Sequence, residues 1–284
     1  MSMPGGSGVL APALSEPLTQ AKDGRWSDFW VRLASAAVLG PLALLALWHG
    51  GSAWAFLIAV ALFGLGTEWA RLAGLPRFTG RAMLLPCGLL AVEMVALTGG
   101  FQAGFVALLV LALIAWRLDG RFAAVGVPYA GIGGLSLLWL RLQPMHGLQD
   151  TLFLVVVIWS TDVGAYLVGR VIGGARLAPR ISPGKTWSGS IGGLLIGGVA
   201  GAMLAGGPNA IDWWALGPAC GLSIFGQAGD LLESAVKRHL GVKDSGHTIP
   251  GHGGLFDRVD GFLAAAPLAA LLALLLHGGV PLWQ

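Results

Sequence analysis

The chain has 284 residues, of which 55% are hydrophobic and only 11% are charged, and its mean hydropathy is +0.75. An average soluble domain carries roughly 25% charged residues, so this chain has too few charges to cover a soluble protein of its size. A net charge of +3 could indicate nucleic-acid binding in a soluble chain. Here the basic residues follow an alternating membrane pattern instead, and we expect no nucleic-acid partner. The composition therefore predicts an integral membrane protein.

Long apolar segments run through most of the chain, and a helix needs about 20 apolar residues to cross a bilayer. Nine spans are predicted, at residues 29–48, 52–72, 82–98, 101–117, 122–141, 149–169, 188–206, 211–229 and 259–277. We therefore expect an all-α, polytopic transmembrane bundle, with about five spans in residues 29–148 and about four in residues 149–284. Residues 1–28 lack a signal-peptide pattern and are expected to form a cytoplasmic tail.

The basic residues are distributed unevenly over the connections between these spans. Sixteen of the 17 Lys and Arg residues fall in alternate connections, and only Arg141 falls on the opposite side. Because cytoplasmic loops carry an excess of Lys and Arg, this alternation predicts a cytoplasmic N-terminus and a C-terminus outside. The long polar loops, residues 170–188 and 230–258, are then cytoplasmic, and chemistry is expected on that face.

Polar residues gather between residues 229 and 261, which hold five of the 14 acidic residues and three of the six histidines. Four of them follow the i, i+3, i+4, i+7 spacing of one helix face: Asp230, Glu233, Ser234 and Lys237. Asp257 and Asp260 share a second helix face. The glycine-rich turn between the two groups can bring the two helix ends together.

Carboxylates on two facing helix ends suit a hard cation such as Mg²⁺. Four basic residues nearby could hold phosphate oxygens: Lys237, Arg238, Lys243 and Arg258. The glycine-rich turn adds backbone N–H donors. Phosphoryl and nucleotidyl transfer need this combination of a metal, cations for the phosphates and close approach. The alternative is an interfacial loop whose charges only pair with one another or extend toward water.

A second polar segment, residues 180–190, contains Gly184-Lys185-Thr186. It lacks the upstream glycine and the preceding strand of a P-loop, so a nucleotide site of that kind is excluded. Ser182, Lys185 and Thr186 could still bind phosphate at the start of the next helix. A simple helix N-cap explains the hydroxyl groups equally well.

Asp162, Glu68 and Glu93 lie inside predicted spans, where an ionisable group is costly and indicates a functional or a packing role. Asp162 is a candidate for substrate binding. Glu68 is expected to pair with Arg71 or Arg32 near the inner boundary. Glu93 stands alone in the third span, and we expect it to make a hydrogen bond in the interior.

Several runs of residues resemble the signature of the phosphatidate cytidylyltransferases, also called CDP-diacylglycerol synthases. The main runs are Ser234-Ala235-Val236-Lys237-Arg238, Lys243-Asp244-Ser245-Gly246 and Pro250 to Asp260. Shorter matches are Asp162 with Tyr166 to Arg170, Ile181 to Pro183 with Lys185 to Trp187, and Gly229-Asp230 with Glu233-Ser234. The resemblance covers about residues 155–265. Gly184 and Ser188 depart from it, because the family usually has a lysine and an acid there.

The resemblance implies a multi-pass enzyme that converts CTP and phosphatidic acid into CDP-diacylglycerol and pyrophosphate with Mg²⁺, either alone or together with a second cation. It implies metal-site roles for Asp230, Asp257 and Asp260, and it makes these residues and Ser234 the catalytic candidates. The candidates for substrate binding are Asp162, Ser182, Lys185, Thr186, Lys237, Arg238, Lys243, Asp244, His252 and Arg258. A homodimer is possible, and the expected location is a bacterial cytoplasmic (inner) membrane, with the active site on its cytoplasmic face.

Other classes of membrane protein fit the sequence less well. A secondary transporter should show two related halves, whereas the polar clusters here crowd into the C-terminal third. Another enzyme that uses CTP at a membrane, such as a polyprenol or phytol kinase, would share the cytoplasmic cation clusters. The D-G-x-x-A-R motif of CDP-alcohol phosphotransferases is absent from the sequence.

Overall fold

The computed structural model describes residues 20–76, 79–208, 210–246, 248–249, 251, 253–275 and 280–283, with side chains from residue 31 on except at position 32. The helices in this part of the chain are α1 (Gln20–His49), α2 (Gly51–Leu72), α3 (Gly80–Gly99), α4 (Phe101–Leu142), α5 (Gly147–Ile172), α6 (Trp187–Gly206), α7 (Leu216–His239) and α8 (Phe256–Leu275). A 3₁₀ turn, η1 (Trp213–Ala215), precedes α7, and two short strands, β1 (Arg176–Ala178) and β2 (Ser182–Thr186), lie between α5 and α6.

Six of the described helices are long and apolar enough to cross a membrane: α2, α3, α4, α5, α6 and α8. This confirms the predicted all-α membrane bundle. The apolar part of α1 is shorter and covers Leu33–His49. α1 already begins at Gln20, inside the segment that was expected to be a tail, and residues 1–19 lie outside the described part.

The predicted spans 101–117 and 122–141 both lie in α4, which is broken at Gly120. Gly120 has φ 89°, a backbone conformation that glycine adopts without the steric cost of a side chain. The predicted span 211–229 also differs from α7, which begins at Leu216 and continues to His239. The polar face expected from Asp230 to Lys237 therefore belongs to a helix that extends beyond the predicted span.

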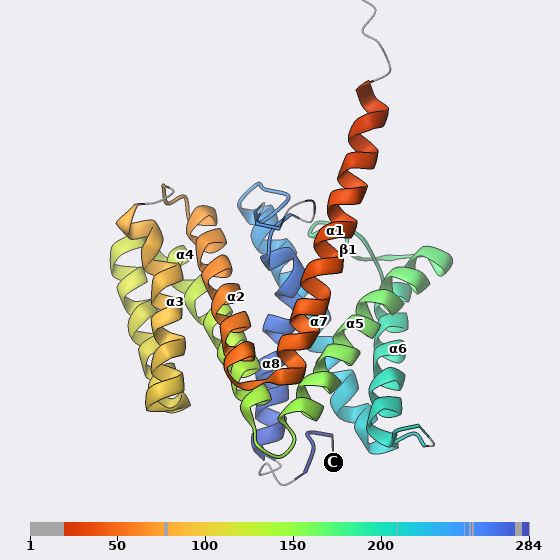
Figure 1. Ribbon diagram of the computed structural model, residues 1–284. Helices are drawn as coiled ribbons and strands as arrows, with labels where there is room; N and C mark the ends of the chain where they lie inside the picture. The colour runs from red at the N-terminus through yellow and green to blue at the C-terminus, as the bar shows by residue number, and fades with distance from the viewer. Residues whose placement is uncertain are drawn as a thin grey trace, which may run out of the picture.

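The β1–β2 hairpin and the connection between α7 and α8 lie at the same end of the bundle, at the top of Figure 1, while the C-terminal segment lies at the other end. The strands pair antiparallel, with Arg176 opposite Thr186 and Ala178 opposite Ser182. The sequence did not predict these strands, which are three and five residues long. They bring the second polar segment beside the first.

Small residues allow α5 and α6 to pack with their backbones close together, as is common in membrane bundles. A Cβ atom at Gly197 would lie 2.2 Å from Thr161 Oγ1, and one at Gly193 would lie 2.7 Å from the carbonyl oxygen of Thr161. Larger residues at either position would push the helices apart. The close contact places the start of α6 beside the C-terminal half of α5, which carries Asp162.

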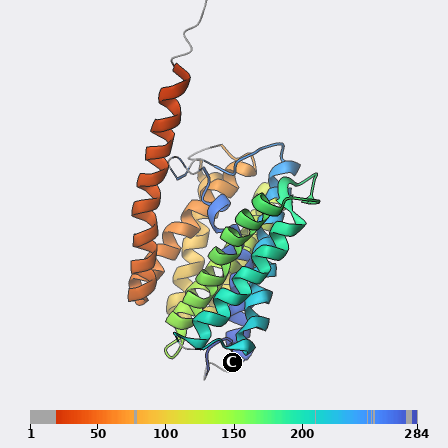
Figure 2. The same cartoon turned by 90° about the vertical axis from the view of Figure 1, so that its right-hand side faces the viewer.

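α1 stands to one side of the other helices (Figure 2), and Arg141 ties its C-terminal end to α4. Arg141 Nε donates to the carbonyl oxygen of Leu47 (2.6 Å), and Nη2 donates to that of Trp48 (3.0 Å). These carbonyls belong to the last turn of α1, where no helical donor is available. The single basic residue that departs from the alternating pattern thus caps a helix.

Candidate active site

A cavity of about 730 Å³ opens at the hairpin end of the bundle, between α5, the β1–β2 hairpin, α6, α7 and α8. Its polar lining consists of Asp162, Tyr166, Arg170, Arg176, Lys185, Thr186, Ser190, Gln227, Asp230, Glu233, Lys237, Asp257, Arg258 and Asp260. The two polar segments found in the sequence therefore line one cavity, together with the acid in the sixth predicted span.

Three carboxylates form a cluster in this cavity, which we call the acidic triad: Asp230, Glu233 and Asp260. One oxygen atom of each lies within 4.8 Å of the others. Gly229 permits this arrangement, because a Cβ atom there would lie 2.5 Å from the carbonyl oxygen of Asp260. α7 and α8 can therefore approach closely at the level of the triad.

The acidic triad fits a hard divalent cation, which prefers carboxylate oxygens. Glu233 Oε1 is buried and has no hydrogen-bond partner among the described residues. Burial raises the pKa of Glu233, and Asp257 raises it further, while Lys237 lowers it. A bound cation would compensate this buried oxygen. The sequence did not assign Glu233 to the metal site, although its position three residues after Asp230 places it on the same helix face.

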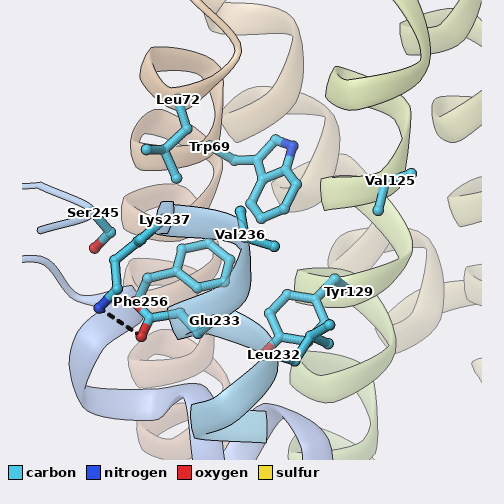
Figure 3. Close-up of a pocket in the computed structure, with 10 residues that line it drawn as sticks. All are labelled: Trp69, Leu72, Val125, Tyr129, Leu232, Glu233, Val236, Lys237, Ser245 and Phe256. Carbon is cyan, nitrogen blue, oxygen red and sulfur yellow. Dashed lines mark ion pairs between the residues drawn. The ribbon is translucent and has the colours of Figure 1, made fainter. Parts of the chain in front are cut away.

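Asp257, the third predicted metal ligand, makes contacts of a different kind. Its Oδ1 accepts from Lys237 Nζ (2.5 Å), and its Oδ2 accepts from the backbone N–H groups of Ser245 and Gly254 (both 3.2 Å). Lys237 Nζ also pairs with Glu233 (2.8 Å), the ion pair drawn in Figure 3. Lys237 therefore links Asp257 to the triad. The metal-binding role of Asp257 stays a prediction.

The hairpin reaches the acidic triad through Lys185, whose Nζ forms an ion pair with Asp230 Oδ2. The next residue, Thr186, is the N-cap of α6, and its Oγ1 accepts from the backbone N–H of Gly189 (3.1 Å). The simpler interpretation of this threonine, a helix cap, is therefore confirmed. The cap fixes the chain directly after Lys185 and so limits where the lysine can reach.

The other sequence candidates divide into two groups. Asp162 and Arg258 line the cavity. Ser182, Ser234, Arg238, Lys243 and Asp244 are described but are not among its lining residues. Arg238 Nε donates to the carbonyl oxygen of Ile181 (3.3 Å) and so joins the end of α7 to the hairpin. His252 lies outside the described residues, and the proposed roles of all these residues stay predictions.

The polar residues of the cavity that were not predicted as site residues include Gln227, Arg170 and Arg176. Gln227 Oε1 accepts from Ser190 Oγ (2.5 Å), which joins α7 to α6. Arg170 donates to the hydroxyl of Tyr166 one helical turn earlier (2.7 Å), and Arg176 donates to the carbonyl oxygen of Gly184 (3.3 Å). Neither of these two arginines forms an ion pair with a carboxylate of the described residues, so both keep positive charge at the cavity.

For two acids in the N-terminal half, the contacts in the structure differ from those expected. Glu68 forms no ion pair with Arg71; it accepts hydrogen bonds from residues 245–256, and the side chain of Arg32 is outside the described part. Glu93 is buried, but neither of its oxygens has a hydrogen-bond partner in the described chain. The partners of Glu68 depend on tertiary packing that the sequence pattern does not specify.

A second, smaller cavity of about 70 Å³ lies between α2, α4, α7 and α8 (Figure 3). Glu233 and Lys237 line one part of it, and the rings of Trp69, Tyr129 and Phe256 line another. The Tyr129 and Phe256 rings stack with their centroids 5.6 Å apart. The hydroxyl of Tyr129 and Glu233 Oε1, two polar atoms of residues that line this cavity, are both buried without described hydrogen-bond partners.

A carboxylate cluster surrounded by lysine and arginine, at one end of a membrane bundle, defines a membrane enzyme for phosphate-bearing substrates. The chain belongs to the cytidylyltransferase family, whose model matches residues 30–276. It is therefore a nucleotidyltransferase, and the resemblance seen in the sequence is confirmed and extends into the N-terminal half.

Two relatives illustrate the similarity. The phosphatidate cytidylyltransferase of Brucella suis biovar 1 (strain 1330) is 42% identical over 256 residues, which cover 86% of this chain and 93% of that protein. The phosphatidate cytidylyltransferase of Staphylococcus aureus (strain COL) is 43% identical over 161 residues, which cover 55% of this chain and 59% of that protein.

Proposed function

We propose that this chain transfers the cytidylyl group of CTP to phosphatidic acid and releases pyrophosphate. A phosphate oxygen of phosphatidic acid attacks the α-phosphorus of CTP and forms the new P–O bond of CDP-diacylglycerol. The bond from the α-phosphorus to the oxygen that bridges to the β-phosphate breaks, and pyrophosphate leaves with that electron pair. The observation that carries the proposal is the acidic triad in contact with Lys185 inside one large cavity.

The reaction brings two negatively charged phosphates together, so the site has to offset their repulsion. Asp230, Glu233 and Asp260 would hold a divalent cation such as Mg²⁺, which would supply positive charge to phosphate oxygens. Arg170, Arg176, Lys185 and Arg258 line the same cavity and can pair with phosphate oxygens. No side chain has to become covalently modified, because the lipid phosphate is itself the nucleophile.

We also propose that the chain crosses the membrane nine times, with a cytoplasmic N-terminus and a C-terminus outside. The break at Gly120 supports two passes within α4. The start of α1 and the C-terminal segment lie at opposite ends of the bundle in Figure 1, as an odd number of passes requires. The segregation of sixteen of the 17 basic residues supports the orientation.

In this orientation the cavity faces the cytoplasm, in a bacterial cytoplasmic membrane. CTP then arrives from solution, and the phosphate of phosphatidic acid lies at the headgroup level of the same membrane face. The polar loops 170–188 and 230–258 would both be cytoplasmic. A second cation and a homodimer stay predictions.

Position-specific labelling of CTP tests the proposed reaction. With CTP labelled at the α-phosphate, the purified protein should place label in lipid only when phosphatidic acid is added. With γ-labelled CTP, the label should leave as pyrophosphate. A polyprenol or phytol kinase would instead transfer the γ-label to a lipid alcohol, and that result would refute the proposal. Asp230→Asn serves as the matched variant and should lose α-label transfer.

A further inference from the structure

Glu68, in the penultimate turn of α2, is a buried carboxylate that does not line the large cavity. Glu68 is only 3% exposed. Oε1 accepts from the backbone N–H of Leu255 (2.7 Å) and from the hydroxyl of Thr248. Oε2 accepts from the backbone N–H of Phe256 (2.9 Å) and lies 3.2 Å from the hydroxyl of Ser245. All four partners are neutral donors from the segment that leads into α8.

These contacts make Glu68 a cap for α8 that is supplied by another helix. The first N–H groups of a helix have no acceptor within the helix. Phe256 is the first residue of α8, and Glu68 accepts both its N–H and that of Leu255. A negative charge at this end also interacts favourably with the helix dipole. The start of α8 is therefore fixed relative to α2.

The same carboxylate is linked to the acids of the site through Ser245. Ser245 Oγ lies 3.2 Å from Glu68 Oε2 and 3.1 Å from Asp257 Oδ2, and its single proton can serve one carboxylate at a time. The backbone N–H of Ser245 donates to Asp257 as well. A Cβ atom at Gly254 would lie 1.9 Å from Ser245 Oγ, and one at Gly246 would lie 2.6 Å from Glu68 Oε1. The loop thus has little room to adopt another path.

Trp69, the residue after Glu68, also fixes the start of α8, in this case by packing. Its ring contacts the ring of Phe256, with centroids 5.4 Å apart, and Phe256 is only 1% exposed. Figure 3 shows Phe256 in this aromatic group, close to Lys237 and Glu233. Two neighbouring residues of α2 therefore fix the first residue of α8, one by hydrogen bonds and one by ring contact.

We infer that Glu68 is a positioning residue for the cytidylyl transfer, and this inference rests on the proposed function. By capping α8 and holding Ser245, it places Asp257 and Asp260 opposite the acids of α7. It acts through the start of α8 and does not itself touch the phosphates. The N-terminal half of the chain thereby sets the geometry of a site whose other residues all come from the C-terminal half.

Glu68→Gln tests this role with little change in shape. Each oxygen of Glu68 accepts a backbone N–H, and an amide NH₂ cannot accept, so one N–H at the start of α8 loses its partner. We expect kcat to fall roughly tenfold to a hundredfold, because small misplacements of catalytic groups have effects of this size. KM for CTP should stay within about threefold, since the residues proposed to contact the phosphates are unchanged. Hydrogen exchange of the amides at residues 253–257 should become faster.

Glu93→Gln is the matched control, because Glu93 is also a buried acid of the N-terminal half (2% exposed) and has no described hydrogen-bond partner. It should leave kcat and the exchange of residues 253–257 unchanged. Ser245→Ala provides a second variant if Glu68→Gln folds poorly. It should lower kcat in the same direction, and the double variant should lose less than the sum of the two single effects, because both act through Asp257.

The outcomes separate this inference from the proposed function. If the wild-type protein transfers cytidylyl groups while Glu68→Gln and Ser245→Ala keep wild-type kcat and exchange, the positioning role is refuted and the function stands. An equal loss of kcat in Glu93→Gln would also refute it, because the effect would then reflect general destabilisation. If the wild-type protein has no transferase activity, the function is refuted. Faster exchange at residues 253–257 in Glu68→Gln would still support the cap.

Discussion

Lys237 lies between two carboxylates, and its removal should reveal how much this charge network stabilises the fold. Its Nζ is 2.8 Å from Glu233 and 2.5 Å from Asp257. The three side chains are 13%, 6% and 14% exposed, respectively. Lys237→Met keeps the length of the side chain and removes the charge. It leaves two largely buried carboxylates close together without a cation.

Removing one partner of a buried ion pair costs about 3–5 kcal/mol, and the remaining exposure here favours the lower end, about 3 kcal/mol. Lys185 provides a comparison within the same cavity. In its ion pair with Asp230, the Lys185 side chain is 27% exposed and the Asp230 side chain is 40% exposed. Because solvent screens this pair, its loss should cost about 1 kcal/mol of stability or less. For a chain of this size, we expect Lys237→Met to lower the Tm by roughly 6–10 °C and Lys185→Met by less than about 3 °C.

Thermal unfolding of the detergent-purified variants, followed by the fluorescence of the 12 tryptophans, measures this difference. The double variant Lys237→Met/Glu233→Gln should recover part of the stability, because it also removes one of the unpaired carboxylates. The reasoning is wrong if Lys237→Met is as stable as the wild-type protein, or if Lys185→Met is destabilised to the same extent.

Three further predictions concern substrate, metal and topology. Lys185→Met should raise the apparent KM for CTP roughly tenfold to a hundredfold, because the charge-assisted contact between Lys185 and a phosphate is lost. A rise in the KM for phosphatidic acid alone would assign the hairpin to the lipid phosphate. Glu233→Gln should weaken Mn²⁺ binding, measured by electron paramagnetic resonance, by about tenfold or more, and Asp257→Asn by less; the opposite order would return the metal role to Asp257. A reporter active only in the cytosol and fused after Gln284 should give no signal; a strong signal would remove one pass from the topology.

The membrane fold could be predicted from the sequence because apolar length and the placement of Lys and Arg follow from the bilayer itself. The features of the fold that differ from the prediction depend on local geometry. The break in α4 falls at Gly120, between Arg117 and Arg121, where two separate spans were expected. Arg141 departs from the charge pattern because it caps α1, and a cap of this kind depends on a contact between distant residues.

The site could be predicted in part for a similar reason. Asp230 and Asp260 were identified because acids at helix ends are rare in such a chain and follow helical spacing. Glu233 completes the cluster with them, whereas Asp257 accepts from the loop amides of Ser245 and Gly254, and spacing alone does not determine this. The role of Glu68 could not be predicted, because all its described partners lie at residues 245–256, far along the chain.

Mass spectrometry of the lipid products tests the central claim most directly. The purified protein is incubated with CTP, phosphatidic acid and Mg²⁺, in parallel with Asp260→Asn, which keeps the shape of the side chain and removes one charge of the acidic triad. We expect CDP-diacylglycerol from the wild-type protein only when both substrates are present. The rate of the variant should be lower by about a hundredfold or more. No CDP-diacylglycerol from the wild-type protein would contradict the proposed reaction, and a wild-type rate from Asp260→Asn would contradict the site.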